Sequence, residues 1–122
     1  MTDTPPLLER IQQYAAGFEG AWPDHPWGHE SPVYKLANQR IFVFTGQTED
    51  GAATVMVKLG RDAAEEAKLL SFVKTAPYIG RHGWVQATIR DEAELEIVLP
   101  WIDRSYELVA PQPKSRPRGK RQ

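Results

Sequence analysis

Apolar side chains recur at helical spacing in three segments of the chain. The first covers residues 6–17, and the second covers residues 60–76, with Asp62 as its expected N-cap. The third covers about residues 94–109, where Pro100 must either sit in the first turns or kink the helix. The spacing therefore predicts three amphipathic helices.

Short runs of β-favouring residues with alternating apolar positions mark four strands. They are residues 33–37, 40–45, 54–59 and 84–90. Only Asn38 and Gln39 separate the first two runs, a length that fits a tight hairpin. Residues 21–29 hold two prolines and two tryptophans, so we expect a loop there whose indoles pack into the core. Short connections between the first three strands predict an antiparallel meander.

Together these elements predict an α+β fold, with an antiparallel sheet of about four strands backed by helices. The sequence has 122 residues, enough for one hydrophobic core and too few for a second. We expect one domain over residues 1–110. Residues 111–122 are basic and rich in proline, and we expect a disordered tail there.

Strand alternation gives the sheet two different faces. One face is apolar and should be covered by the helices; it holds Ile41, Val43, Val55, Val57, Leu59, Val85, Ala87 and Ile89. The other mixes rings with cations; it holds Arg40, Phe42, Phe44, Met56, Lys58, Trp84, Gln86, Thr88 and Arg90. Rings can stack on bases while cations contact phosphates. The alternative is that these rings pack beneath the first helix and the tryptophan-rich loop.

The charges of the chain are distributed unevenly. Residues 1–110 hold 10 Lys and Arg against 16 Asp and Glu, a balance of −6, whereas residues 111–122 hold 5 Lys and Arg and no acid. An acidic body should repel phosphate at long range, and the basic tail should attract it. The sequence also has no cysteine, which excludes disulfides and thiolate metal sites. Apolar runs are too short for a membrane span and the first residues do not resemble a signal peptide, so we expect a cytoplasmic protein.

Five segments, in order, resemble the signatures of the MmcQ/YjbR family. They are Pro-Trp-Gly-His at 26–29, Pro-Val-Tyr-Lys at 32–35 with Arg-Ile-Phe at 40–42, Val-Met-Val-Lys at 55–58, Gly-Arg-His-Gly-Trp-Val at 80–85, and Trp-Ile-Asp-Arg-Ser-Tyr-Glu-Leu-Val-Ala-Pro at 101–111. The resemblance implies a CyaY-like (frataxin-like) fold and a DNA-binding role through a double-wing motif. It implies no enzymatic activity and no cofactor. Pro100 and the acidic residues 92–95 depart from the family pattern.

The leading hypothesis is a non-enzymatic domain that binds DNA weakly or without sequence preference. Its expected contacts are Lys35, Arg40, Lys58, Arg81, His82, Trp84, Arg116, Arg118, Lys120 and Arg121. The last four would attract phosphate through the tail, and the others would make contacts from the sheet face or from hairpin wings at Asn38 and residues 46–51. His82 lies in a turn, where capping the end of a strand is the favoured role and phosphate contact is the alternative.

The alternative hypothesis is an adaptor for a protein or a small ligand, with no nucleic-acid role. Its aromatic pocket would be formed by Trp22, Trp27, His29, Trp84 and Tyr106. Salt distinguishes the two hypotheses, because phosphate binding weakens steeply as salt rises and aromatic packing does not.

No pattern of catalytic residues stands out. Ser105 lacks a Gly-x-Ser-x-Gly elbow, and we expect it to allow close helix packing while Tyr106 buries its ring and hydrogen-bonds its hydroxyl. His25 and His29 are four apart, but Pro26 and Gly28 between them prevent the helix that a shared metal would need. We therefore expect no enzyme, no metal site and no cofactor.

Overall fold

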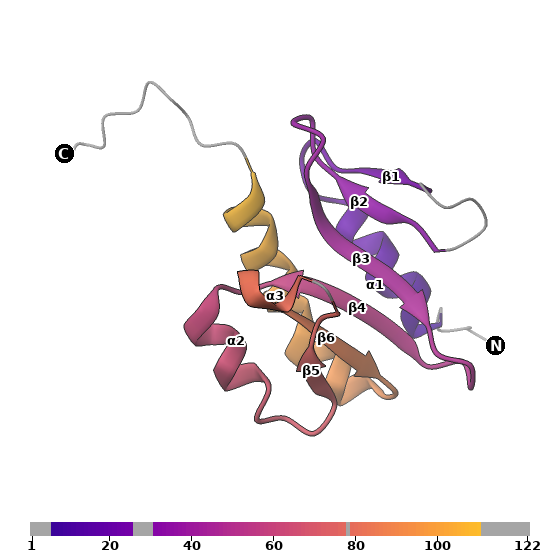
Figure 1. Cartoon of the computed structure of the whole chain (residues 1–122). Coiled ribbons are helices and arrows are strands. Elements are labelled where there is room, and N and C mark those ends of the chain that lie inside the picture. Colours follow the sequence, from indigo (N-terminus) through magenta and orange to yellow (C-terminus); the bar gives the residue numbers. More distant parts are fainter. Residues whose placement is uncertain (1–5, 26–30, 78, 111–122) are drawn as a thin grey trace.

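The computed structural model describes residues 6–25, 31–77 and 79–110. They form one α+β domain with three α-helices and a six-stranded sheet (Figure 1). In chain order the elements are α1 (Leu7–Ala16), β1 (Trp22–Asp24), β2 (Val33–Lys35), β3 (Ile41–Gln47), β4 (Ala53–Lys58), α2 (Arg61–Ala67), β5 (Val73–Thr75), the 3-10 helix η1 (Gly80–His82), β6 (Trp84–Ile89) and α3 (Glu92–Val109). The α+β class and the antiparallel sheet are confirmed.

The strand order is β1-β2-β3-β4-β6-β5, and every neighbouring pair is antiparallel. The expectation of about four strands was wrong because two short edge strands were not recognised. β1 forms inside the segment predicted as a loop. It tolerates Pro23 because it pairs on one side only, so a missing N–H need not break a ladder.

The second missed strand, β5, lies where the second helix was expected to continue to residue 76. That helix ends at Ala67, and the chain then brings Val73 against Ala87 at the sheet edge, where Val73 is buried. Leu69, assigned from the sequence to the apolar side of the helix, is 86% exposed instead. The expected Asp62 cap is also wrong, since Gly60 occupies the N-cap position and no side chain caps it.

Helices α1 and α3 pack on one face of the sheet, where they contact β3 and β4, and α2 lies beside β6 (Figure 1). The core lies between these layers. Its largest fully buried apolar side chains are Phe42, Ile11, Ile89, Leu95 and Ile102. Burial of each such side chain contributes roughly 1.5–3 kcal/mol, so this covered face supplies most of the stability.

A bulge in β3 changes which residues face the helices. Lys35 pairs with Ile41 and Tyr34 with Val43, which leaves Phe42 as the extra residue. The Phe42 ring is fully buried and packs against Phe18 and Tyr106 on the helix side. Its predicted place on the opposite face was therefore wrong, because one inserted residue interrupts the alternation.

Ser105 of α3 joins the helix to the sheet at this bulge. Its fully buried hydroxyl donates to the Phe42 carbonyl oxygen at 2.6 Å and accepts from the Lys58 amide nitrogen at 2.9 Å. The Tyr106 hydroxyl donates to the Glu19 carbonyl oxygen at 2.8 Å. The Tyr106 hydroxyl is thus hydrogen-bonded as expected, whereas the two hydrogen bonds of the buried Ser105 were not predicted from the sequence.

Helix α3 is longer at its start than predicted and continues through Pro100. Its N-cap is Asp91, whose carboxylate accepts from the Glu94 amide at 2.9 Å. Proline removes the hydrogen bond to the carbonyl four residues earlier, here that of Glu96. Both Pro100 and Glu96 are exposed, so water can reach that carbonyl. Within the described residues, no helix has the length and apolar character needed to cross a membrane.

Candidate nucleic-acid interface

A hollow of about 450 Å³ lies on the sheet face opposite α1 and α3. It is bounded by the β2–β3 turn, β3, β4, η1, β6 and the end of α3. The lining residues are Gln39, Arg40, Ile41, Phe44, Lys58, Ile79, His82, Trp84 and Val109. The hollow therefore gathers four of the predicted contact residues, Arg40, Lys58, His82 and Trp84, from distant parts of the sequence.

Close backbone packing holds η1 against the sheet beside this hollow. The amides of Leu59 and Gly60 donate to the Gly83 carbonyl oxygen at 2.8 and 3.3 Å. Gly83 has a φ of 85°, and a Cβ there would lie 2.7 Å from the Gly60 Cα atom. Only glycine fits this combination of positive φ and close approach. The position of His82 at the hollow therefore depends on Gly83.

The β2–β3 turn presents Arg40 at the rim. Gln39 adopts a left-handed φ of 70°, and its amide donates to the Leu36 carbonyl oxygen at 2.8 Å. The Asn38 carboxamide accepts from the Arg40 amide at 3.1 Å and donates to the Val109 carbonyl oxygen at 3.3 Å. The turn is thus fixed to the last residue of α3.

Aromatic rings form the floor of the hollow. Trp84 is 9% exposed, and its ring meets Phe44 edge to face with centroids 5.6 Å apart. Phe44 is half-buried. Because so little of the indole is accessible, Trp84 supports the floor and cannot serve as a broad stacking platform.

The charge of the lining is positive. Arg40 and Lys58 carry this charge, His82 lies beside them, and no Asp or Glu is among the described residues of the lining. Lys58 is the register partner of Trp84 and is half-buried, and within the described ranges its ammonium makes no ion pair. An unneutralised, partly desolvated cation attracts anions more strongly than a solvated one. The hollow is therefore a cationic site on an acidic domain.

Lys35 lies outside the hollow and is already engaged. Its ammonium lies 2.8 Å from the Asp24 carboxylate and 5.6 Å from the ring centroid of Trp22. The hydrogen bond from Lys35 holds the pKa of Asp24 below its usual value. Arg81 is part of η1. The tail residues Arg116, Arg118, Lys120 and Arg121 lie outside the described residues.

The structure does not bring together the described residues of the aromatic pocket in the alternative hypothesis. Trp22 on β1 and Trp84 on β6 are separated by β2, β3 and β4, roughly 19 Å along the sheet at ordinary strand spacing. Tyr106 lies on the helix side, against Phe18. Trp27 and His29 lie outside the described residues.

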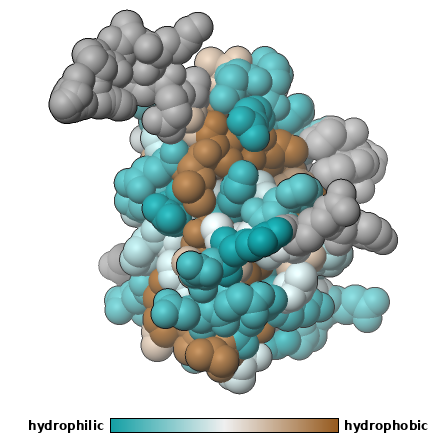
Figure 2. Space-filling view, turned by 60° about the vertical axis from the view of Figure 1, so that its left-hand side comes forward, coloured by the Kyte–Doolittle hydropathy of each residue, from teal (hydrophilic) through white to brown (hydrophobic). Residues whose placement is uncertain are grey.

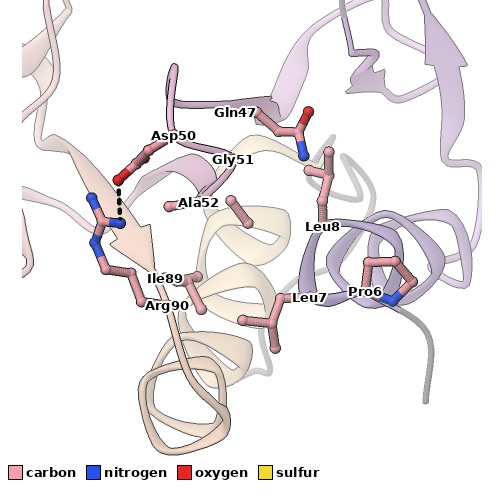
Figure 3. A pocket seen from close by; sticks show the side chains of 10 residues that line it. Pro6, Leu7, Leu8, Gln47, Asp50, Gly51, Ala52, Ile89 and Arg90 are labelled. Carbon is pink, nitrogen blue, oxygen red and sulfur yellow. Dashed lines mark hydrogen bonds and ion pairs between the residues drawn. The ribbon is translucent and has the colours of Figure 1, made fainter. Parts of the chain in front are cut away.

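A second hollow, of about 280 Å³, lies between the start of α1 and the β3–β4 turn (Figure 3). Its cation, Arg90, forms an ion pair with Asp50 at 2.9 Å. Hydrogen bonds from Thr48 and then Arg90 lower the pKa of Asp50. Since the Arg90 guanidinium is already paired with a carboxylate, this hollow is less suited to binding phosphate.

Sequence reasoning missed several lining residues of the first hollow, namely Gln39, Ile41, Ile79 and Val109. Ile41 was assigned to the covered face because the bulge was not foreseen. Apolar residues reach the surface in separate patches enclosed by hydrophilic ones (Figure 2). No sequence pattern shows that Ile79 and Val109, among the apolar residues, lie at this hollow. Within the described residues, no group of three or more His, Asp or Glu could hold a metal ion.

Comparison with known protein families identifies the family of this chain. The family model described as YjbR matches residues 16–108. The chain belongs to the YjbR family. This match includes every residue that lines the first hollow except Val109. A search of the curated proteins finds no match.

Two solved structures share the YjbR fold at low sequence identity. Protein DR2400 of Deinococcus radiodurans, described by the domain name DUF419, has a TM-score of 0.74 and 16% identity, over 92% of this chain and 86% of that one. A protein from Pseudomonas syringae, the structural genomics target PsR293, has a TM-score of 0.65 and 16% identity, over 83% of this chain and 97% of that one. At this identity the likeness supports the fold alone.

Proposed function

We propose that this YjbR domain is a non-enzymatic nucleic-acid-binding module that uses the hollow on its open sheet face. One observation supports the proposal: Arg40 and Lys58 lie, with His82, beside an apolar floor, and no carboxylate is among the described residues that line it. Cations next to accessible ring surface suit a ligand that is both anionic and aromatic. We name no nucleophile, base or metal for a reaction.

We propose that the basic tail is a second source of positive charge for a polyanion. Val109 lines the hollow, and the sequence beyond Ala110 carries 5 Lys and Arg and no acid. The acidic body, with its balance of −6, opposes phosphate elsewhere on the domain. We accordingly propose weak DNA binding of low sequence preference, concentrated at the hollow.

Of the two hairpins suggested as wings of a double-wing motif, the β2–β3 turn is the better candidate. It brings Arg40 to the hollow. The β3–β4 turn carries Glu49 and Asp50, and Asp50 already binds Arg90. We propose that the first wing touches nucleic acid and the second does not.

The test is fluorescence anisotropy of labelled duplex and single-stranded DNA at low and near-physiological salt. The full chain is compared with a truncation that ends at Ala110, where the described fold ends. We expect the truncation to bind more weakly but measurably. Five tail contacts would add a slope of about −4 to −5 to log affinity against log salt for duplex. Binding lost entirely with the tail would mean that the folded domain has no site.

A small-ligand adaptor remains the second candidate, and the volume of the hollow favours it. A hollow of about 450 Å³ falls within the roughly 300–1,000 Å³ typical of small-molecule pockets. An adaptor of this kind should bind an anionic aromatic compound in the truncation and the full chain alike, and neither should bind oligonucleotides.

A further inference from the structure

We infer that the hollow accepts one unpaired nucleotide, a base with its phosphate, and discriminates against paired DNA. The inference rests on the proposed function and specifies the ligand of the same site. It predicts that single strands bind more tightly than duplexes of equal length, at equal salt.

The apolar part of the lining favours an unpaired base over a duplex. Ile41, Phe44 and Ile79 supply partly exposed ring and aliphatic carbon, and the buried Trp84 and Val109 complete the apolar lining. A duplex keeps its base faces stacked inside and presents phosphate and sugar, so it would leave this floor without an apolar partner. An unpaired base has a free ring face that can cover the floor.

The charged part of the lining is placed to meet the phosphate of that base. Arg40 comes from the β2–β3 turn and Lys58 from β4, so cationic side chains approach the floor from two elements, and His82 of η1 lies beside them. A base on the floor therefore has its phosphate within the range of these groups. Trp84 exposes only 9% of its surface and Phe44 is half-buried, so the base contacts mainly the Phe44 ring and is not sandwiched. Such a contact is modest and independent of base identity.

Charge elsewhere on the open face does not offer an equivalent site. Lys35 is held by Asp24 and Arg90 by Asp50, while Lys74 of β5 lines a separate hollow together with Glu94. Each of these carboxylates would repel a phosphate drawn to its partner cation. Among the described cations of the sheet face, Lys58 beside the floor is thus the best placed to meet a phosphate.

The experiment measures anisotropy of the full chain with a labelled 12-nucleotide single strand and with the matching duplex. We expect the single strand to bind about tenfold more tightly, because one base contact with aromatic surface is lost in the duplex. The variant Arg40→Gln should weaken single-strand binding about fivefold. Arg61→Gln, on α2, removes the same charge at an exposed position outside the hollow and should change it less than about twofold.

A second measurement distinguishes a loss of binding from a loss of folding. Titration with a nucleoside monophosphate should shift the Trp84 indole NMR signal of the full chain, and the Arg40→Gln variant should reduce that shift while its thermal midpoint stays unchanged. Arg40 is exposed, so its replacement leaves the core intact.

The outcomes separate this inference from the proposed function. Equal binding of single strand and duplex, with no response of the Trp84 signal, would overturn the inference and leave nucleic-acid binding in place. A response to the monophosphate without any oligonucleotide binding would support the nucleotide site and overturn the proposed function. No binding of either would overturn both.

Discussion

The two faces of the sheet differ in what their side chains do. On the covered face, Phe42 is fully buried against Phe18 and Tyr106, and no charged side chain is among the buried residues of the described ranges. On the open face, Phe44, two residues later on β3, is half-buried beside Trp84 and shares a hollow with Lys58. The contrast indicates that one face stabilises the fold while the other is available for binding.

The largest expected effect compares these two phenylalanines directly. Phe42→Ala should lower the free energy of unfolding by about 3–5 kcal/mol, the usual cost of a large core truncation. Phe44→Ala should lower it by roughly half as much, because the ring is only partly buried. Chemical denaturation measures both. If the face distinction holds, single-strand binding at a temperature where both variants are folded falls only for Phe44→Ala.

Ser105 tests the polar contact within the covered face. Ser105→Ala leaves the Phe42 carbonyl and the Lys58 amide without their hydroxyl partner, and an unsatisfied buried polar group costs about 1–3 kcal/mol. Ser71→Ala, at an exposed position, should change stability by less than about 0.5 kcal/mol. Equal stabilities of the two variants would show that the bulge does not depend on Ser105.

The fold was predictable where side-chain alternation or helical spacing was regular. Val55 and Val57 of β4 were correctly assigned to the covered face, as were the buried positions Val98 and Ile102 of α3. Prediction failed at β1 and β5, which are three residues long and depend on pairing with a neighbour rather than on their own pattern. Local sequence carries little of that long-range information.

The candidate site was predictable only in its charged and aromatic members. Lys58 and Trp84 were expected together because they alternate onto one face, and the register pairs them. Ile41 was expected on the other face, and a one-residue bulge changed its direction. Val109 reaches the hollow through the packing of α3, which no strand pattern encodes.

Replacing Pro100, at an exposed position of α3, should change the free energy of unfolding by a smaller amount. Pro100→Ala restores an N–H that can donate to the Glu96 carbonyl, and it removes a poor helix former from the middle of α3. We expect a gain of about 1 kcal/mol in the free energy of unfolding, because the lost restriction of the unfolded chain offsets part of the benefit. Binding of DNA should not change. A loss of stability would mean that α3 needs the proline for its packing.

The smallest effect concerns the ion pair that links the two covering helices. The Arg10 guanidinium donates two hydrogen bonds to the Glu92 carboxylate, at 2.5 and 2.6 Å, and these hold the pKa of Glu92 below its ordinary value of 4.5. Because the folded pKa is lowered, the pair stabilises the fold fully above that ordinary value, and its contribution is lost as the pH falls through the folded pKa. Glu92→Gln should therefore flatten the decline of stability below about pH 4.5 without affecting binding at the open face. Thermal melts from pH 7 to pH 3 test this, with Glu66→Gln, at an exposed position of α2, as the control. An equally steep decline in Glu92→Gln would show that other carboxylates set the acid sensitivity of the covered layer.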